Sequence, residues 1–547
     1  MNLSVSQKWL HSTGYLLLTL PTILFFLLTL KIWIGTICSI GLLIALYFAI
    51  HGYNNDTFFS IPLKNLIIVA ILVMAWCILC GQGGIMAQKP DHHWRNAIMR
   101  DMVNYDWPVI YENGTGLVYY IGYWVVPALI GKIGLFWNAN AAWSIANIAL
   151  LCWSTLNITV VTLLILSAFN RSDTISCLLV CGMLALFSGM DIIGYVIYGL
   201  TSGKFCFPWN IEWWLNWSGS ITLAYTSNSH LLGWVFNQAV PAWLGAILYY
   251  RERRIETAAF IGALLLPLSP FSLLGLIILA SLDCICGIII NIKHENMIVV
   301  LRHIFSIPNV LSIIILLPIF YLYYSNNQTI ERSDVANAQA ATSFLFSVLN
   351  IRNWSQFGHY IVFCLLEFGI LWVLMLKNNY KDRLYYICLA SLLFFGATKI
   401  ISMDYIIRSS IIPLFFLMLF AIKYVLTDCA VSWKDFSFKY LKKQLRFYLV
   451  ILCLSIGSVT AFCEMLDTAY ITQDCIRHGY QLPADKLGSL ALTPPNTNRN
   501  FLVLSAESSA FYKYLARKPN NNAERIHFVN SQFKEFTSDD VYNYKSN

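Results

Sequence analysis

Long apolar segments constrain the fold of this chain more than any other feature of its sequence. Segments of about 20 residues with almost no charge recur along the 547 residues, and a helix of that length crosses a hydrocarbon core ~30 Å thick. Helices suit a membrane because each one satisfies its backbone hydrogen bonds internally. Hydrophobic residues make up 58% of the chain and charged residues 12%, against about half and about a quarter in average soluble domains. The sequence therefore predicts an all-α polytopic membrane protein.

About thirteen segments are predicted to span the membrane, namely 12–30, 32–50, 65–82, 143–168, 175–190, 231–250, 257–269, 272–291, 308–324, 356–376, 384–401, 411–426 and 447–463. Cytoplasmic loops carry the excess of Lys and Arg. The densest cationic loops are "RERR" at 251–254, "KNNYKDR" at 377–383 and "KYLKKQLR" at 439–446. We expect the protein to lie in the cell membrane, that is, the inner or cytoplasmic membrane. Counting spans outward from these loops places the N-terminus in the cytoplasm and the C-terminus on the extracytoplasmic side.

The apolar segment 117–136 would break this alternation if it were a span. Its tyrosines and Trp124 suit the headgroup region and Pro127 interrupts it, so we expect an interfacial or re-entrant helix at the outer face. A transmembrane domain then covers 1–463, and 464–547 form an extracytoplasmic tail with a small α/β appendage. The predicted outer loops are 83–142, 191–230, 325–355 and 402–410.

Composition and missing motifs exclude several functions. The net charge of +8 reflects the positive-inside pattern, and no basic stripe interleaved with aromatic residues indicates a nucleic-acid partner. Most of the 15 cysteines lie in apolar runs, where they act as small hydrophobic residues. The chain contains no GxxxxGK[ST], GxGxxG, HExxH or GxSxG motif. If the chain catalyses a transfer, its donor must therefore arrive already activated, on a lipid.

The first outer loop concentrates charge in "PDHHWRN", with Asp91, His92, His93 and Arg95. A helix that starts near Asp91 places Asp91 beside Arg95, because residues four apart share a face. The carboxylate can act as a general base or hold a divalent cation with water. The alternative is a solvated loop whose charges pair with one another.

The second outer loop contains Asp191 in "FSGMDIIG" and Glu212, Trp213 and Trp214 in "NIEWW". Tryptophans clustered at an interface most often anchor the protein in lipid. They also suit a sugar-binding cleft, because a flat apolar ring stacks on a pyranose face.

Polar residues near the ends of three other spans are further candidates. Asn237 and Gln238 begin a span, where they either bond substrate hydroxyls or join helices to each other. Lys399, Asp404 and Arg408 lie at the outer ends of two spans. Asp404 and Arg408 are spaced for an ion pair, whereas Lys399 and Arg408 together suit an anionic lipid headgroup.

Several of these segments resemble the GT-C class of integral-membrane glycosyltransferases. "PDHHWRN" is similar to the acidic first outer loop of that class, "GLVYYIGYWVVPALIGKIG" to its juxtamembrane helices and "FSGMDIIG" to its later acidic site. "FSGMDIIG", "NIEWW", "NQAVPAWL", "SPFSLLGL" and "MDYIIRSSIIP" also resemble segments of an uncharacterised group of bacterial polytopic proteins, over most of 85–425. The chain departs from the class in two ways: the hairpin 12–50 precedes the acidic loop, and "DHHW" replaces the usual pair of adjacent acids.

The resemblance implies an inverting transfer of sugar from a polyprenyl-phosphate-linked donor to a glycan, lipid or protein acceptor of the cell envelope. Asp91 and Asp191 would be the catalytic residues, with Asp91 as the base. Lys399 and Arg408 would offset the charge of the leaving phosphate. Asp191 and Glu212 would orient hydroxyl groups, and His92 or His93 would be an alternative base or help to hold a metal.

Two other functions fit the same residues. A transporter or flippase of a lipid-linked saccharide would line its path with these charges, although the halves of the chain show no repeat. A polysaccharide polymerase or ligase would use arginines in a large outer loop, such as Arg332 and Arg352.

Overall fold

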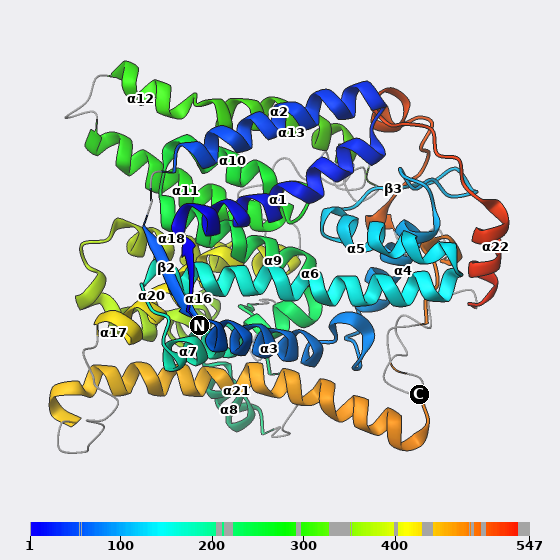
Figure 1. Ribbon diagram of the computed structural model, residues 1–547. Helices are drawn as coiled ribbons and strands as arrows, with labels where there is room; N and C mark the ends of the chain where they lie inside the picture. Colours follow the sequence, from blue (N-terminus) through cyan, green and yellow to red (C-terminus); the bar gives the residue numbers. More distant parts are fainter. Residues whose placement is uncertain are drawn as a thin grey trace.

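Helices form most of the regular structure in the computed structural model (Figure 1). The structure describes residues 2–533 except 54, 56, 204–210, 213–222, 292–296, 326, 328–350, 352, 399–402, 429–440, 481, 483–485 and 494–498. The helices of the first half are α1 (Gln7–Thr29), α2 (Ile32–His51), α3 (Leu63–Leu79), α4 (His92–Asn104), α5 (Gly122–Ile133), α6 (Ala139–Ala168), α7 (Thr174–Leu186), α8 (Asp191–Ser202) and α9 (Asn228–Glu252).

The second half continues the bundle. Its helices are α10 (Ile255–Leu265), α11 (Pro270–Asn291), α12 (Met297–Ile304), α13 (Ile307–Ser325), α16 (Trp354–Cys364), α17 (Ile370–Asn379), α18 (Arg383–Ala397), α19 (Met403–Ser409), α20 (Ile411–Lys423), α21 (Leu441–His478) and α22 (Ala523–Ser531). Two small antiparallel sheets pair β1 (Asn2–Ser6) with β2 (Phe58–Pro62) and β3 (Gly116–Leu117) with β4 (Leu502–Val503).

Nine helical segments in the described part of the chain are long and apolar enough to cross a membrane. They are Gln7–Thr29, Ile32–His51, Ala139–Ala168, Thr174–Thr201, Asn228–Glu252, Pro270–Ile290, Ile307–Ser325, Trp354–Asn379 and Leu445–His478. Each overlaps a predicted span, although Thr174–Thr201 and Leu445–His478 run beyond the predicted ends at 190 and 463. The fold is therefore that of a multi-pass α-helical membrane protein.

Four further predicted spans correspond to shorter apolar helices, Leu63–Leu79, Ile255–Leu265, Arg383–Ala397 and Ile411–Thr427. Helix α10 has only 11 residues, or about 17 Å at 1.5 Å per residue. Helix α5, in the segment expected to lie at the interface, has 12 residues. Both are too short to cross a core ~30 Å thick without help from neighbouring residues.

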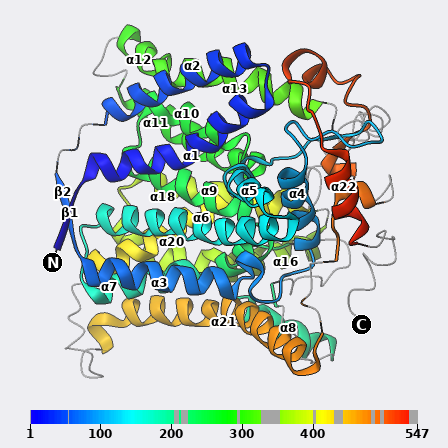
Figure 2. The ribbon, with the colours of Figure 1, turned by 45° about the vertical axis from the view of Figure 1, so that its right-hand side comes forward.

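Helix α9 lies in the middle of the bundle, in contact with α6, α20, α10 and α11 (Figures 1 and 2). Nearly all of its side chains are buried, including the polar ones of Asn228, Ser229, His230, Asn237 and Gln238. The backbone leaves helical geometry at Val235 (φ −137°, ψ 37°), and Pro241 cannot donate a hydrogen bond to the carbonyl of Asn237. The first third of α9 is therefore set at an angle to the rest.

One end of the bundle carries the β1–β2 sheet and is called the β1 end. His11 of α1 contacts Glu252 at the end of α9. Arg253 pairs with Asp283 at 2.7 Å and with Asp382 at 2.8 Å. The cationic loops 251–254 and 377–383 therefore lie at the same end, as their charge predicts.

The opposite end carries α4, α5 and the C-terminal tail, and is called the α4 end (Figure 1). Strand β3 of the first large loop pairs with β4 of the tail. The Tyr512 hydroxyl donates to the Leu117 carbonyl at 2.7 Å, and Arg517 Nε donates to the Leu30 carbonyl at 3.1 Å. The tail is thus packed into the first loop and the end of α1.

Helix α21 continues to His478, although the tail was expected to begin at Glu464. The predicted span 447–463 ends just before two acids, Glu464 and Asp467. Both carboxylates contact Lys89 from the first loop. Because Lys89 compensates the charge of both carboxylates, the helix continues past them.

Candidate functional site

A glycine-rich turn leads from α3 to the charged loop at the α4 end. Gly81 and Gly83 have positive φ angles of 81° and 78°, which favour glycine because it lacks a Cβ. After this turn Asp91 occupies the N-cap of α4. Its carboxylate lies 3.1 Å from Arg95 Nη1, as the spacing of four residues predicts. The Asp91 side chain is 42% exposed and the Arg95 side chain 6%.

Arg408 of α19 reaches the same region from the other half of the chain. Its Nη1 donates to the Tyr120 hydroxyl at 2.8 Å, and Gln238 Nε2 donates to the same oxygen at 3.3 Å. The Ser272 hydroxyl donates to the Arg408 backbone carbonyl at 3.1 Å. Arg408 is therefore held in place through both its side chain and its backbone.

The charges of this Asp91–Arg408 cluster (Asp91, Arg95 and Arg408) are close enough to affect one another. Partial burial raises the pKa of Asp91, but Arg95 and then Arg408 outweigh it and hold that pKa below the ordinary value. Asp91 is thus ionised at neutral pH. One carboxylate and two guanidinium groups leave the cluster net positive, which favours an anionic ligand.

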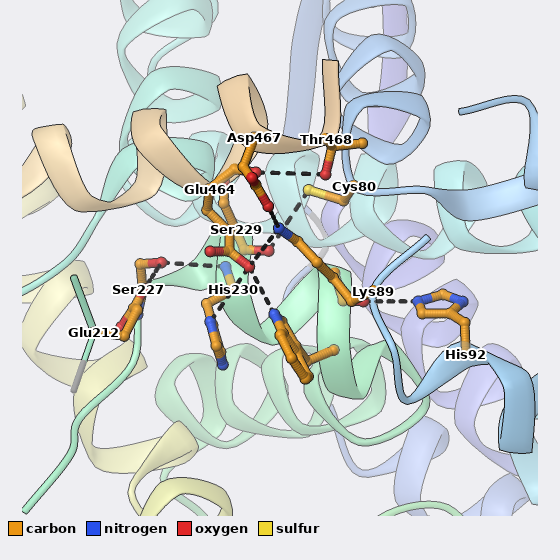
Figure 3. Close-up of polar contacts among 12 residues, drawn as sticks. Cys80, Lys89, His92, Glu212, Ser227, Ser229, His230, Glu464, Asp467 and Thr468 are labelled. Atoms are coloured by element: carbon orange, nitrogen blue, oxygen red, sulfur yellow. Dashed lines mark hydrogen bonds and ion pairs between the residues drawn. The ribbon is translucent and has the colours of Figure 1, made fainter. Parts of the chain in front are cut away.

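A second group of charges, the Lys89 network, lies where the loop meets α21 and α9 (Figure 3). Lys89 Nζ lies 3.2 Å from Glu464 and 2.6 Å from Asp467. Glu464 also accepts a hydrogen bond from Trp234 Nε1 at 2.6 Å and lies 3.5 Å from His230 Nδ1. Burial lowers the pKa of Lys89, but the two carboxylates outweigh it and raise that pKa above its usual value.

The predicted acids of the second loop lie beside this network. The Ser188 hydroxyl donates to Asp191 at 3.0 Å. The Ser227 backbone N–H donates to both carboxylate oxygens of Glu212, at 3.1 and 3.0 Å. Burial raises the pKa of Glu212 well above its usual value, and the charges of Asp191 and Glu464 add to the rise. Through these hydrogen bonds Glu212 holds Ser227, the N-cap residue of α9, in place.

The two histidines of "DHHW" are both buried in α4. His92 Nε2 donates to the Gly233 carbonyl at 2.7 Å, which joins α4 to α9. Burial lowers the pKa of His92 to about 3 and that of His93 to about 4. Both rings are therefore neutral at pH 7. The hydrogen bond from His92 to Gly233 fixes the start of α4 against α9.

The two amides of α9 differ in their contacts. Gln238 belongs to the Arg408–Tyr120 contact described above. Asn237 is fully buried, and neither of its amide atoms has a hydrogen-bond partner among the described residues. A buried amide without partners is rare, so Asn237 has hydrogen-bonding capacity to offer a ligand or water.

Several predicted residues cannot be placed. Trp213, Trp214 and Lys399 lie outside the described residues, and Asp404 is in α19 but its side chain is not described. Among the described residues, no group of three or more His, Cys, Asp or Glu side chains is arranged to hold a metal ion.

Sequence reasoning missed Lys89, Tyr120, His230, Glu464 and Asp467. Lys89 directly precedes "PDHHW", and Glu464 and Asp467 are three residues apart on one face of α21. The sequence signal for this network was the pair Glu464 and Asp467, two acids at the end of a predicted span with a spacing that puts them on one helix face.

Comparison of the chain with known protein families, characterised proteins and solved structures found no match. The class therefore rests on the fold alone, which is that of a multi-pass α-helical membrane protein with two charge clusters at its α4 end.

Proposed function

We propose that this protein is an inverting glycosyltransferase that moves a sugar from a polyprenyl-phosphate-linked donor to a cell-envelope acceptor. One observation carries the proposal. Asp91, from the first large loop, lies within electrostatic reach of Arg408, from helix α19 more than 300 residues later, at one end of a membrane bundle. A carboxylate and a guanidinium so placed supply the base and the phosphate-binding cation that this reaction needs.

The proposed orientation puts the α4 end outside the cytoplasmic membrane and the β1 end, with its arginines, in the cytoplasm. The nine long helical segments and the four shorter helices α3, α10, α18 and α20 then supply thirteen spans. Helix α5 lies at the outer interface, and the tail, with its strand β4 and helix α22, is extracytoplasmic.

In the proposed reaction the Asp91 carboxylate accepts the proton of an acceptor hydroxyl. The hydroxyl oxygen forms a bond to the anomeric carbon from the face opposite the phosphate. The bond from that carbon to the phosphate oxygen breaks, and its electron pair leaves with the polyprenyl phosphate. Arg408 offsets the charge on this leaving group, and Lys399, which precedes α19, is assigned the same role.

Donor binding would also prepare the base. In the free protein Arg408 helps to hold the pKa of Asp91 down. An anionic phosphate beside Arg408 compensates that positive charge, so the pKa of Asp91 rises. A carboxylate with a higher pKa is a stronger base, and it gains this strength only when the donor is present.

The test uses the full chain in lipid nanodiscs with polyprenyl-phosphate-linked hexoses and pentoses and lipid-extracted acceptors, and measures release of polyprenyl phosphate. Asp91→Asn keeps the shape of the side chain and removes the base, so we expect a loss of about 10²–10⁴-fold. Arg408→Gln should lose about 10²–10³-fold. Glu507→Gln and Arg477→Gln, which alter exposed charges at the same end, should retain the parent rate.

Full activity of Asp91→Asn with every donor would overturn the proposal. Movement of intact lipid-linked saccharide across the bilayer, without release of polyprenyl phosphate, would identify a transporter instead.

A further inference from the structure

A pocket of about 440 Å³ is lined by residues that are near Asp91 in the chain, such as Gln88 and Asn96. Asp91, Arg95 and Arg408 do not line this pocket. It is formed by the turn before α4, by α4 itself, by the first turns of α6 and by Leu482 after α21. Three carboxamides line it, those of Gln88, Asn96 and Asn147, together with Ser144 and Trp143. None of the described lining residues carries a charge.

The pocket has a rigid polar wall. Asn96 Nδ2 donates to Gln88 Oε1 at 2.7 Å, and Gln88 Nε2 donates to the Gly81 carbonyl at 2.9 Å. The Arg100 guanidinium lies 3.9 Å from the centre of the Trp143 ring and holds this ring in place. These contacts fix the wall before any ligand arrives, which reduces the entropy that binding costs.

A glycine keeps the pocket open. Gly84, with φ of 67°, lines it. A Cβ at Gly84 would meet only the Asn147 amide, with the nearer atom, Oδ1, at 3.8 Å. A side chain here would therefore extend into open space of the pocket.

We infer that this pocket binds a neutral saccharide unit of the acceptor. A carboxamide NH2 donates two hydrogen bonds and its oxygen accepts two, so Gln88 and Asn147 keep donor and acceptor capacity beyond their bonds to Gly81, Asn96 and Trp143. This capacity matches the adjacent hydroxyls of a sugar. Trp143, which has Arg100 against one face of its ring, supplies an apolar ring for a pyranose to contact, and the volume is within the range of small-ligand sites. The absence of charge among the described lining residues disfavours phosphates and acidic sugars.

The assignment to the acceptor rests on the proposed function, whereas saccharide binding itself does not. Gln88 and Asn96 flank the loop that carries Asp91. A saccharide held by these two residues would thus lie against the same short segment as the proposed base. Ile148, which lines the pocket, is 61% exposed, so the pocket is open to the surface of the bundle. A saccharide could therefore reach it either as part of a membrane lipid or as a free sugar.

The experiment measures saccharide binding to the full chain in phosphatidylcholine nanodiscs by saturation-transfer NMR. The probes are neutral mono- and disaccharides, a monohexosyl diacylglycerol that competes with them from within the disc, and glucuronic acid as a charged comparison. Competition by the glycolipid identifies a lipid-linked ligand, and binding of the free sugar without such competition identifies a soluble one.

The variant is Gly84→Asn, because asparagine tolerates a positive φ better than most residues and its side chain would extend into the part of the pocket beside Asn147. Its matched control is Gly114→Asn, at another glycine of positive φ with open space around it. We expect at least a tenfold rise in Kd for Gly84→Asn and none for Gly114→Asn. Asn147→Leu, compared with Asn140→Leu at an exposed position of α6, repeats the test without a change at glycine.

Equal affinity in Gly84→Asn and the parent, or binding of neither free nor lipid-linked neutral saccharide, would overturn the inference. Asp91→Asn should bind saccharide normally. If Asp91→Asn retains transfer while Gly84→Asn loses binding, the proposed base is wrong and the pocket stands. If Asp91→Asn loses transfer and Gly84→Asn binds normally, the pocket is wrong and the proposed function stands.

Discussion

Asp101 is a buried carboxylate that joins α4 to the C-terminal tail. One of its oxygens accepts hydrogen bonds from the Tyr111 hydroxyl at 2.8 Å and from the Leu490 backbone N–H at 3.0 Å. Burial raises the pKa of Asp101 to about 7, although these hydrogen bonds oppose the rise. Its folded-state pKa thus lies above its unfolded-state value of about 3.9, and the protonated form stabilises the fold.

The sign of the pH dependence follows from this shift. Between pH of about 4 and about 7 the folded state binds more protons at Asp101 than the unfolded state, so the free energy of unfolding falls as pH rises. Asp101→Asn keeps an acceptor oxygen and removes the titration. We expect the stability of this variant relative to the parent to increase with pH, by up to ~4 kcal/mol at ~1.36 kcal/mol per pKa unit.

Denaturant unfolding in detergent micelles at several pH values would measure this difference. Glu507→Gln, at an exposed acid of the tail, should follow the parent at every pH. An Asp101→Asn variant that runs parallel to the parent would show that Asp101 does not titrate in this range.

At the scale of elements, the contact between α11 and α19 positions Arg408. A Cβ at Gly275 of α11 would lie 2.2 Å from the Ser409 carbonyl oxygen, far inside van der Waals contact. Only glycine lets the two helices approach so closely, and Arg408 directly precedes Ser409.

Gly275→Ala should push α19 away from α11. Overpacking of this kind costs about 1–3 kcal/mol of stability, and a displacement of about 1 Å at a catalytic group can reduce the rate by about 10²-fold. Gly182→Ala is the matched control, since a Cβ at helical Gly182 meets nothing within 4 Å. Thermal unfolding and polyprenyl phosphate release would be measured for both variants, and equal values for the pair would contradict the positioning role of Gly275.

At the scale of the whole molecule, the two ends of the bundle differ in chemistry. The β1 end gathers the arginines of 251–254 and 377–383, whereas the α4 end holds the tail and both charge clusters. This asymmetry predicts that the β1 end faces the cytoplasm.

Fusion reporters in a bacterial inner membrane would test the orientation. Alkaline phosphatase at the C-terminus of the full chain should be active and a green fluorescent protein there dark, because the first needs the outside and the second the cytoplasm. A fluorescent protein at the N-terminus should be bright. The reverse pattern at the C-terminus would place the proposed site in the cytoplasm.

The helical class, the nine long spans and the contact between Asp91 and Arg95 could all be predicted from the sequence. Each depends on residues that are close in the chain: an apolar run sets a span, and a spacing of four residues puts two side chains on one face. Glu464 shows where this reasoning ends. The predicted span ends just before Glu464, but the helix continues and the partner of Glu464 is Lys89 of another loop.

Only the tertiary structure decided which segments meet. Arg408 reaches Tyr120 across 288 positions of the chain, and Lys89 reaches Asp467 across 378. Apolar helices resemble one another in composition, and lipid-facing and helix-facing surfaces are both apolar, so a single sequence does not reveal which helix packs against which. The sequence by itself determined a membrane bundle with charge at its loops, and packing decided that those charges form two clusters at one end.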